Sequence, residues 1–136
     1  MRTEQKHKLA QLRHWRLRRK IHGTKARPRM SVCFTNKNIH VQFIDDAAGA
    51  TLAAVSTRSK SVVERGRLAA NVASAKIIGK LAAETALAKG IQTVVFDRGA
   101  SRYHQSQNKG KDGKPVVVLG KLATLAQAAR QAGLKF

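Results

Sequence analysis

The chain has 136 residues, of which 27 are Lys or Arg and only 7 are Asp or Glu, so its formal net charge is +20. The length predicts one domain with a single core, and the charge predicts a polyanion as partner. A membrane span is not predicted because the sequence holds no run of 18 apolar residues, and a membrane surface is disfavoured because there is no long apolar helix with a basic face. The single cysteine, Cys33, excludes an internal disulfide and a thiol metal cluster.

Residues 1–26 are predicted to form a basic nucleic-acid-binding arm in front of one α/β domain, residues 27–136. The first thirty residues hold eleven of the 27 basic residues and a single acid, Glu4. Residues 3–21 have a helix-permissive composition, but Lys and Arg fall on every side of the helix and leave no face to bury. The arm is therefore predicted to be partly helical or disordered until a polyanion neutralises it. The alternative is a solvated tail that only keeps the protein soluble.

Three strands and a basic loop are predicted to open the folded domain. Alternating apolar and polar residues, separated by turn-forming Asn, Asp and Gly, predict strands over residues 30–35, 39–43 and 51–57. This spacing is typical of an antiparallel meander. Residues 58–66 then predict a loop that carries Arg58, Lys60 and Arg65.

Two helices and a fourth strand are predicted to follow. Residues 67–89 predict a helix ended by Gly90, with a broad apolar face formed by Leu68, Val72, Ala75, Ile78 and Ala82. The Val-rich residues 93–96 predict a strand buried on both sides, parallel to an earlier strand because a helix precedes it. Residues 120–132 predict a second helix ended by Gly133.

These elements predict an α/β (α+β) fold in the order β-β-β-α-β-α. The sheet is expected to be four-stranded and mixed, with both helices on one face and the basic arm outside it. Residues 105–119 are rich in Lys, Gly, Asn and Gln, and they predict a mobile loop or hairpin that turns near Asp112 and Gly113.

The acids and histidines do not form a recognisable catalytic or metal site. A metal-dependent nuclease needs several acids that converge on strand ends, and the only candidates are Asp45, Asp46 and Asp97. Asp45 and Asp46 fall in a predicted turn, where Asp is favoured by local backbone hydrogen bonds. The three histidines of the arm are seven and eight residues apart, too far to share one ion. The sequence therefore predicts no enzyme, no cofactor and no metal.

Four separated segments resemble one known family in their order and spacing. They are RPRMSVCFTNKNIHVQFIDD (27–46), TLAAVST (51–57), VVFDRGASRYH (94–104) and LAQAARQAGLKF at the C-terminus. The chain resembles the family of bacterial large-subunit ribosomal protein eighteen over nearly the whole folded domain. The resemblance implies a structural protein of the cytoplasmic ribosome that binds 5S rRNA in the central protuberance. It also implies contacts with 23S rRNA and with neighbouring large-subunit proteins, and no catalysis.

The resemblance and the basic composition of the arm and loops indicate the candidate RNA-binding residues. The resemblance points to Arg18, Arg19, Lys20, Arg27, Arg29, Asn36, Lys37, Thr57, Arg58, Arg98, Tyr103 and His104. The same arm and loops add Arg13, Arg16, Lys60 and Arg102. These residue types suit folded RNA, whose deep major groove is closed to side chains, so that phosphates, 2′-OH groups and unstacked bases are what a protein contacts.

Three departures from the family pattern stand out. Phe34 stands where the family often has Arg, which removes one expected phosphate contact, and Ala100 and Ser101 follow FDRG where the family usually has GY. Residues 105–119 look like an insertion before the last helix. The alternative function is a general, nucleoid-like nucleic-acid-binding protein, for which charge alone would suffice and which predicts no preference for folded RNA.

Overall fold

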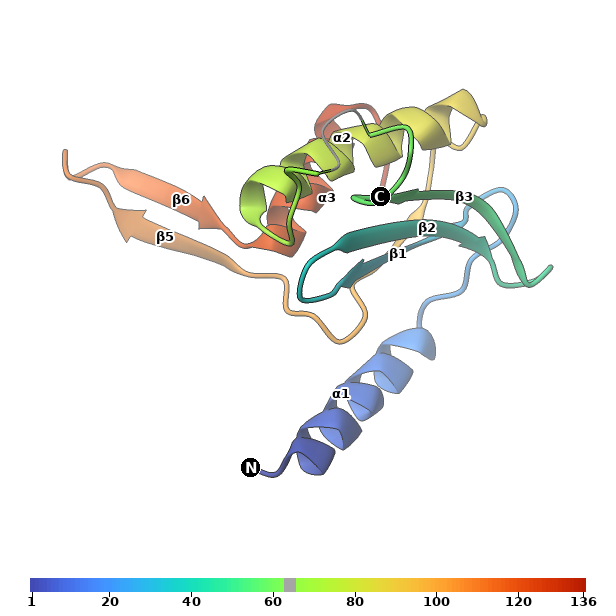
Figure 1. Cartoon of the computed structure of the whole chain (residues 1–136), viewed down its shortest axis with the longest axis horizontal. Helices are drawn as coiled ribbons and strands as arrows, with labels where there is room; N and C mark the ends of the chain where they lie inside the picture. Colours follow the sequence, from blue (N-terminus) through green and yellow to red (C-terminus); the bar gives the residue numbers. More distant parts are fainter. Residues whose placement is uncertain (63–65) are drawn as a thin grey trace.

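A four-stranded mixed sheet forms the centre of the protein (Figure 1). The computed structural model describes residues 1–62 and 66–136, so Arg65 of the predicted basic loop lies outside the described residues. The spatial order is β3-β2-β1-β4, in which β1, β2 and β3 are antiparallel neighbours and β4 runs parallel to β1. The strand bounds are β1 (Arg29–Phe34), β2 (Ile39–Asp45), β3 (Ala50–Ser56) and β4 (Val95–Asp97). The predicted α/β class and mixed sheet are confirmed.

Two helices, α2 (Val72–Ala88) and α3 (Lys121–Gln131), cover one face of the sheet as predicted (Figure 1). Helix α2 begins five residues later than expected, because the Asn71 side chain caps it by accepting a 2.8 Å hydrogen bond from the Ser74 amide. Val72, predicted to be buried, is instead 46% exposed at the first turn. Gly90 and Gly133 follow the two helices with positive φ angles of 77° and 105°, which confirms their predicted role.

The hydrophobic core lies between the sheet and these two helices. Its largest fully buried hydrophobic side chains are Phe43, Met30, Ile39, Ile78, Leu125, Val41 and Val94. The prediction that the fourth strand, residues 93–96, is buried on both sides is wrong except at Val94, since Thr93 is exposed and Val95 and Phe96 are only half-buried. The reason is that β4 is an edge strand, and α2 and α3 cover only one face of the sheet.

A glycine in α2 marks a close approach between α2 and α3. A Cβ atom at Gly79 would lie 2.4 Å from the Leu125 carbonyl oxygen and 3.0 Å from the Ala128 Cβ. Alanine normally stabilises a helix interior by about 1 kcal/mol relative to glycine, but here we expect Gly79→Ala to lower the free energy of unfolding by about 2 kcal/mol. Urea denaturation checks this, with Lys76→Ala on the exposed side of α2 as a control that changes stability by less than about 0.5 kcal/mol. A more stable Gly79→Ala protein would contradict the packing described.

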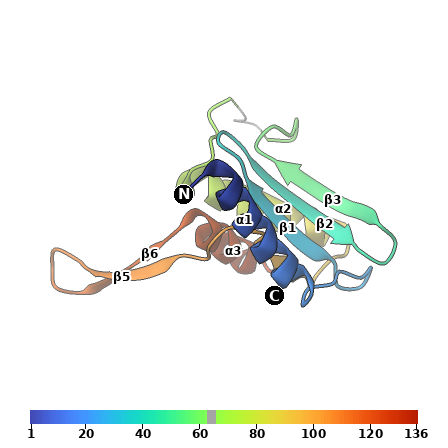
Figure 2. The ribbon, with the colours of Figure 1, turned by 90° about the horizontal axis from the view of Figure 1, so that it is seen from below.

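Two segments project from the domain (Figures 1 and 2). Helix α1 (Thr3–Arg18) lies on the side of the sheet away from α2 and α3, and none of its residues is buried. The expected helix of the arm is present, whereas its disorder in the free protein stays a prediction. The second segment is a two-stranded ribbon, β5 (Gln105–Lys109) and β6 (Pro115–Leu119), which we call the ribbon. Its turn includes Gly113 at φ 72°, close to the predicted position.

The ends of the ribbon meet at its root. The Gly120 amide donates a 2.8 Å hydrogen bond to the His104 carbonyl oxygen, and the ribbon forms a sheet of its own rather than adding to the central sheet. We therefore expect that replacing residues 105–119 with a short glycine linker changes the free energy of unfolding by less than about 1 kcal/mol, as for exposed sites elsewhere. Thermal and urea unfolding of the two proteins measure this. Loss of cooperative unfolding in the shortened protein would show that the ribbon is part of the fold.

Candidate nucleic-acid interface

Basic side chains from two distant parts of the chain line one concave surface, which we call the basic cleft. One wall is the C-terminal half of α1 with the residues after it, and the other is the loop of residues 98–102 after β4. The cleft has a volume of about 470 Å³. Its lining residues are Arg13, Arg16, Leu17, Lys20, Arg98, Gly99, Ala100, Ser101 and Arg102.

The lining makes the basic cleft strongly electropositive. Five of the nine lining residues are Lys or Arg, none is an acid, and all five basic side chains are exposed. Like charges held this close repel one another, so an anion that enters between them is favoured. Phosphate groups of a nucleic-acid backbone match this arrangement, because Arg and Lys can contact them from both walls.

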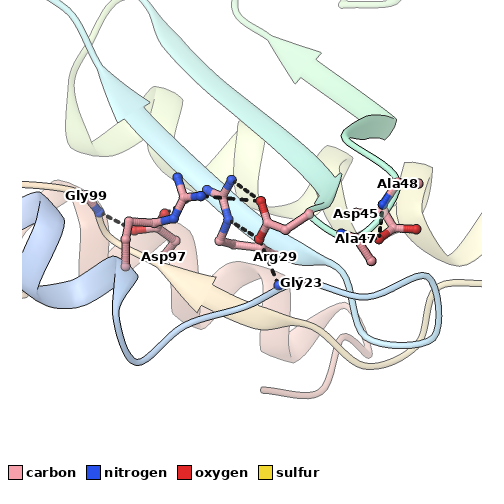
Figure 3. Close-up of polar contacts among 9 residues, drawn as sticks. Gly23, Arg29, Asp45, Ala47, Ala48, Asp97 and Gly99 are labelled. Carbon is pink, nitrogen blue, oxygen red and sulfur yellow. Dashed lines mark hydrogen bonds and ion pairs between the residues drawn. The ribbon is translucent and has the colours of Figure 1, made fainter.

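An ion-pair cluster connects the two walls (Figure 3): Arg29 and Asp97 are buried, Asp46 is half-buried, and we call these three residues the Arg29 cluster. The Arg29 guanidinium donates from Nε and Nη2 to the two carboxylate oxygens of Asp46 at 2.8 and 2.9 Å. Its third nitrogen, Nη1, donates to Oδ2 of Asp97 at 2.8 Å. These bonds join the end of β2 to β1 and β4.

Each carboxylate of the cluster also holds one wall of the basic cleft. On the arm side, Asp46 accepts a 2.8 Å hydrogen bond from the Gly23 amide and lies 3.4 Å from a guanidinium nitrogen of Arg18. On the loop side, Asp97 accepts a 2.8 Å bond from the Gly99 amide (Figure 3). The Arg29 cluster therefore sets the position of the arm relative to the loop of residues 98–102.

The structure corrects two of the predicted RNA contacts. The Arg29 side chain is only 5% exposed and is occupied by two carboxylates, so it serves the fold rather than a phosphate. Thr57 is 1% exposed, and its hydroxyl accepts from the Ile39 amide and donates to the Asn38 side chain. The resemblance indicates both residues, but their polar atoms turn inward.

The Arg29 guanidinium holds the pKa of the Asp46 carboxyl well below its usual value of 3.8, and the Gly23 amide adds to this while burial opposes it. Because the pKa is lower in the folded state, the stabilisation is complete above about pH 5 and is lost progressively as the pH falls through the unfolded-state pKa toward the lower folded-state pKa. We expect Asp46→Asn to lower the free energy of unfolding at neutral pH by about 1 to 3 kcal/mol, and by less at acidic pH.

Urea denaturation of both proteins between about pH 3 and pH 7 measures this change. Asp112→Asn in the exposed turn of the ribbon is the matched control and should leave the pH dependence of the wild type intact. Parallel curves for the wild type and Asp46→Asn would mean that Asp46 is not held ionised by Arg29.

The other predicted contacts fall into two further groups. Asn36 and Lys37 are exposed in the turn between β1 and β2, and Arg58 and Lys60 are exposed after β3. The Thr57–Asn38 hydrogen bond brings these two loops together at one end of the sheet. A last set is next in sequence to the lining of the basic cleft without being part of it, and all its members are exposed: Arg18, Arg19, Tyr103 and His104. Arg27 is exposed as well, and its guanidinium Nε donates to the Val94 carbonyl oxygen.

Three residues of the candidate interface are not predicted from the sequence. The turn pattern predicts the same role for Asp46 as for Asp45, which does accept hydrogen bonds from the amides of Ala47 and Ala48, and no local pattern distinguishes the two acids. Gly23 is needed because a Cβ there would lie 2.4 Å from the Ile44 carbonyl oxygen. Trp15 is 56% exposed between basic residues of α1, a signal that could have marked it as a stacking candidate.

Residues 1–62 and 66–136 contain no group of three His, Cys, Asp or Glu side chains placed to hold a metal ion. Within the same residues, no helix combines the length and the apolar character that crossing a membrane requires.

Comparison with known proteins gives one consistent result. The sequence model of the family described as ribosomal L18 of archaea, bacteria, mitochondria and chloroplasts matches residues 4–109. Proteins named large ribosomal subunit protein uL18 are 49% identical over 125 residues in an Exiguobacterium species and 44% identical over 126 residues in Gloeothece citriformis. The first match covers 91% of this chain and 89% of the relative, and the second covers 93% and 92%.

Proposed function

The chain belongs to the ribosomal L18 family and is a structural constituent of the large ribosomal subunit, and from this premise we propose that it binds 5S rRNA and helps to attach it to 23S rRNA in the central protuberance. The basic cleft is the observation that carries the proposal. It is a concave, acid-free surface with Arg and Lys on two walls, and the Arg29 cluster fixes those walls.

In this proposal, an RNA backbone lies in the basic cleft between α1 and the loop of residues 98–102. Arg13, Arg16 and Lys20 contact phosphates from one wall, while Arg98 and Arg102 contact them from the other. The backbone of A-form RNA is read through phosphates and 2′-OH groups, so sequence-independent contacts from two sides select a shape. The role is non-catalytic: the protein positions RNA and performs no chemistry on it.

The bridge to 23S rRNA is supported by the second group of loop residues. Asn36, Lys37, Arg58 and Lys60 lie at the end of the sheet where β1 meets β2 and β3 ends, outside the lining of the basic cleft. Two separate polar and basic surfaces allow one protein to contact two RNA segments, or an RNA and a neighbouring large-subunit protein. Exposed Trp15 and Tyr103 add rings that can stack on unpaired bases.

Competition binding with the full-length chain tests the proposal. Labelled 5S rRNA is bound first and is then displaced with unlabelled 5S rRNA, tRNA or duplex DNA at equal nucleotide concentration and fixed salt. The proposal predicts that 5S rRNA displaces the label at the lowest concentration. Equal displacement by all three competitors would favour a general nucleic-acid-binding protein, because charge alone does not distinguish them.

A further inference from the structure

The ribbon of residues 105–119 exposes a row of aliphatic side chains in addition to basic ones. Val116, Val117 and Val118 are 49%, 48% and 43% exposed, and the ribbon extends away from the domain (Figures 1 and 2). A two-stranded ribbon alone is marginally stable in water, so contact with a partner would stabilise it. The partner must accommodate both these aliphatic side chains and a basic tip that carries Lys109, Lys111 and Lys114 against a single acid, Asp112.

A second concavity of about 510 Å³ lies where the ribbon joins the domain, and we call it the ribbon cleft. Its volume is within the range of roughly 300 to 1,000 Å³ that small-molecule sites occupy. Its lining residues are Tyr103, Gln105, Val117, Leu119, Gln127 and Arg130. The ribbon contributes one face only, because Gln105 pairs with Leu119 and Gln107 pairs with Val117 across the strands, and paired residues share a face.

The lining of the ribbon cleft combines an aromatic ring, aliphatic side chains and neutral or cationic donors. The Tyr103 ring is 39% exposed, and Gln105 and Gln127 supply amides. The guanidinium of Arg130 lies 4.5 Å from the centre of the Phe136 ring, which holds it at the wall of α3. A nucleobase needs such a set: an apolar or aromatic surface for its face, and amide or guanidinium groups for its edge.

We propose that the ribbon cleft binds an unstacked nucleotide of ribosomal RNA, while the lysines at the tip of the ribbon contact phosphates of the same strand. The inference rests on the proposed function, because it presumes that the chain sits against rRNA. It adds a site for unpaired RNA that is distinct from the basic cleft. RNA is favoured over a protein partner because no acid lines the cleft and the tip is basic.

The test measures the affinity of the full-length chain for a short single-stranded oligoadenylate and for an RNA duplex of the same length. Val117→Glu places a carboxylate in the ribbon cleft, and Arg130→Gln removes the cation from the opposite wall without altering the ribbon. Each is expected to weaken oligoadenylate binding by about tenfold, the scale of one base stacked in a protein site. Deletion of residues 105–119 should weaken it at least as much.

Val116→Glu is the matched control, because Val116 pairs with Asn108 on the opposite face of the same strand. It makes the same charge change and should weaken oligoadenylate binding by no more than about twofold, the effect of one added surface charge. Duplex RNA, whose bases are stacked, should respond equally to Val116→Glu and Val117→Glu. If Val116→Glu and Val117→Glu weakened oligoadenylate binding equally, or if deletion of the ribbon left the affinity for oligoadenylate unchanged, the proposal would be overturned.

Binding of 5S rRNA to the same proteins separates this inference from the proposed function. If the wild type shows no preference for 5S rRNA but Val117→Glu still selectively loses oligoadenylate binding, the proposed function fails and the ribbon cleft stands. If the preference is present and the two valine variants behave alike, the ribbon cleft fails and the proposed function stands.

Discussion

Replacement of Arg29 by Met is expected to lower the free energy of unfolding by about 3 to 5 kcal/mol, a large fraction of the 5 to 15 kcal/mol that typically stabilises a small domain. Methionine preserves much of the volume of the side chain but removes three charge-assisted hydrogen bonds of 2.8 to 2.9 Å. Asp97 is 0% exposed, so its carboxylate would be left buried without its cation. Urea or guanidinium denaturation at neutral pH measures the change.

The control for this experiment is Arg27→Met, two residues earlier in the chain. Arg27 is exposed, and its guanidinium Nε donates one long bond of 3.4 Å to the Val94 carbonyl oxygen. Its replacement should change the free energy of unfolding by less than about 1 kcal/mol. If Arg29→Met were as mild as Arg27→Met, the Arg29 cluster would not be the contact that holds the arm, the sheet and the loop of residues 98–102 together.

Neutralising both walls of the basic cleft is expected to weaken binding of 5S rRNA by at least about a hundredfold at moderate salt. The variant combines Arg13→Gln and Arg16→Gln on α1 with Arg98→Gln and Arg102→Gln on the loop. These four side chains are exposed, so their loss removes phosphate contacts without disturbing the core. Filter binding with labelled 5S rRNA measures the effect, and thermal unfolding confirms that the variant is folded.

The two halves of this variant show whether the walls act together. One variant carries only the two α1 replacements (the α1 pair), and another carries only the two loop replacements (the loop pair). We expect each to bind 5S rRNA more weakly than the wild type, because one RNA backbone contacts both walls. Lys76→Gln with Lys80→Gln, on the exposed side of α2, removes the same charge at a distance from the cleft and should have a much smaller effect. Equal losses for all three pairs would mean that only the total charge matters.

The sheet and its helices could be predicted because local patterns determine them. Period-two alternation identified three strands, and the glycines after α2 and α3 ended the helices where expected. The start of α2 was misplaced because alanine-rich residues suit a helix at many positions, and the capping bond from Asn71 decided the boundary. The sequence of the ribbon does not decide between a loop and a hairpin, since two short strands with polar residues on one of them carry a weak pattern.

The candidate site was predictable in its residue types but not in its assembly. The high density of Arg and Lys indicates the arm, and the resemblance indicates the loop of residues 98–102. Nothing in the sequence places Arg13 opposite Arg98 across one cleft. Asp46 and Asp97 are 51 positions apart, and both can bond to Arg29 only after β1, β2 and β4 have paired. Long-range polar contacts of this kind depend on strand register, which composition does not reveal.

The dependence of 5S rRNA affinity on salt tests the central claim most directly, because each phosphate contact releases counterions when it forms. For the wild type, the α1 pair, the loop pair and the Lys76 and Lys80 control pair, the logarithm of the association constant is plotted against the logarithm of salt concentration. We predict that the α1 pair and the loop pair each make the slope shallower by about 1.4 to 1.8, which is two contacts at about 0.7 to 0.9 each, and that the control pair leaves it unchanged. If the α1 pair and the loop pair both kept the slope of the wild type, or if the control pair made the slope equally shallow, a phosphate-binding role for the basic cleft would be contradicted.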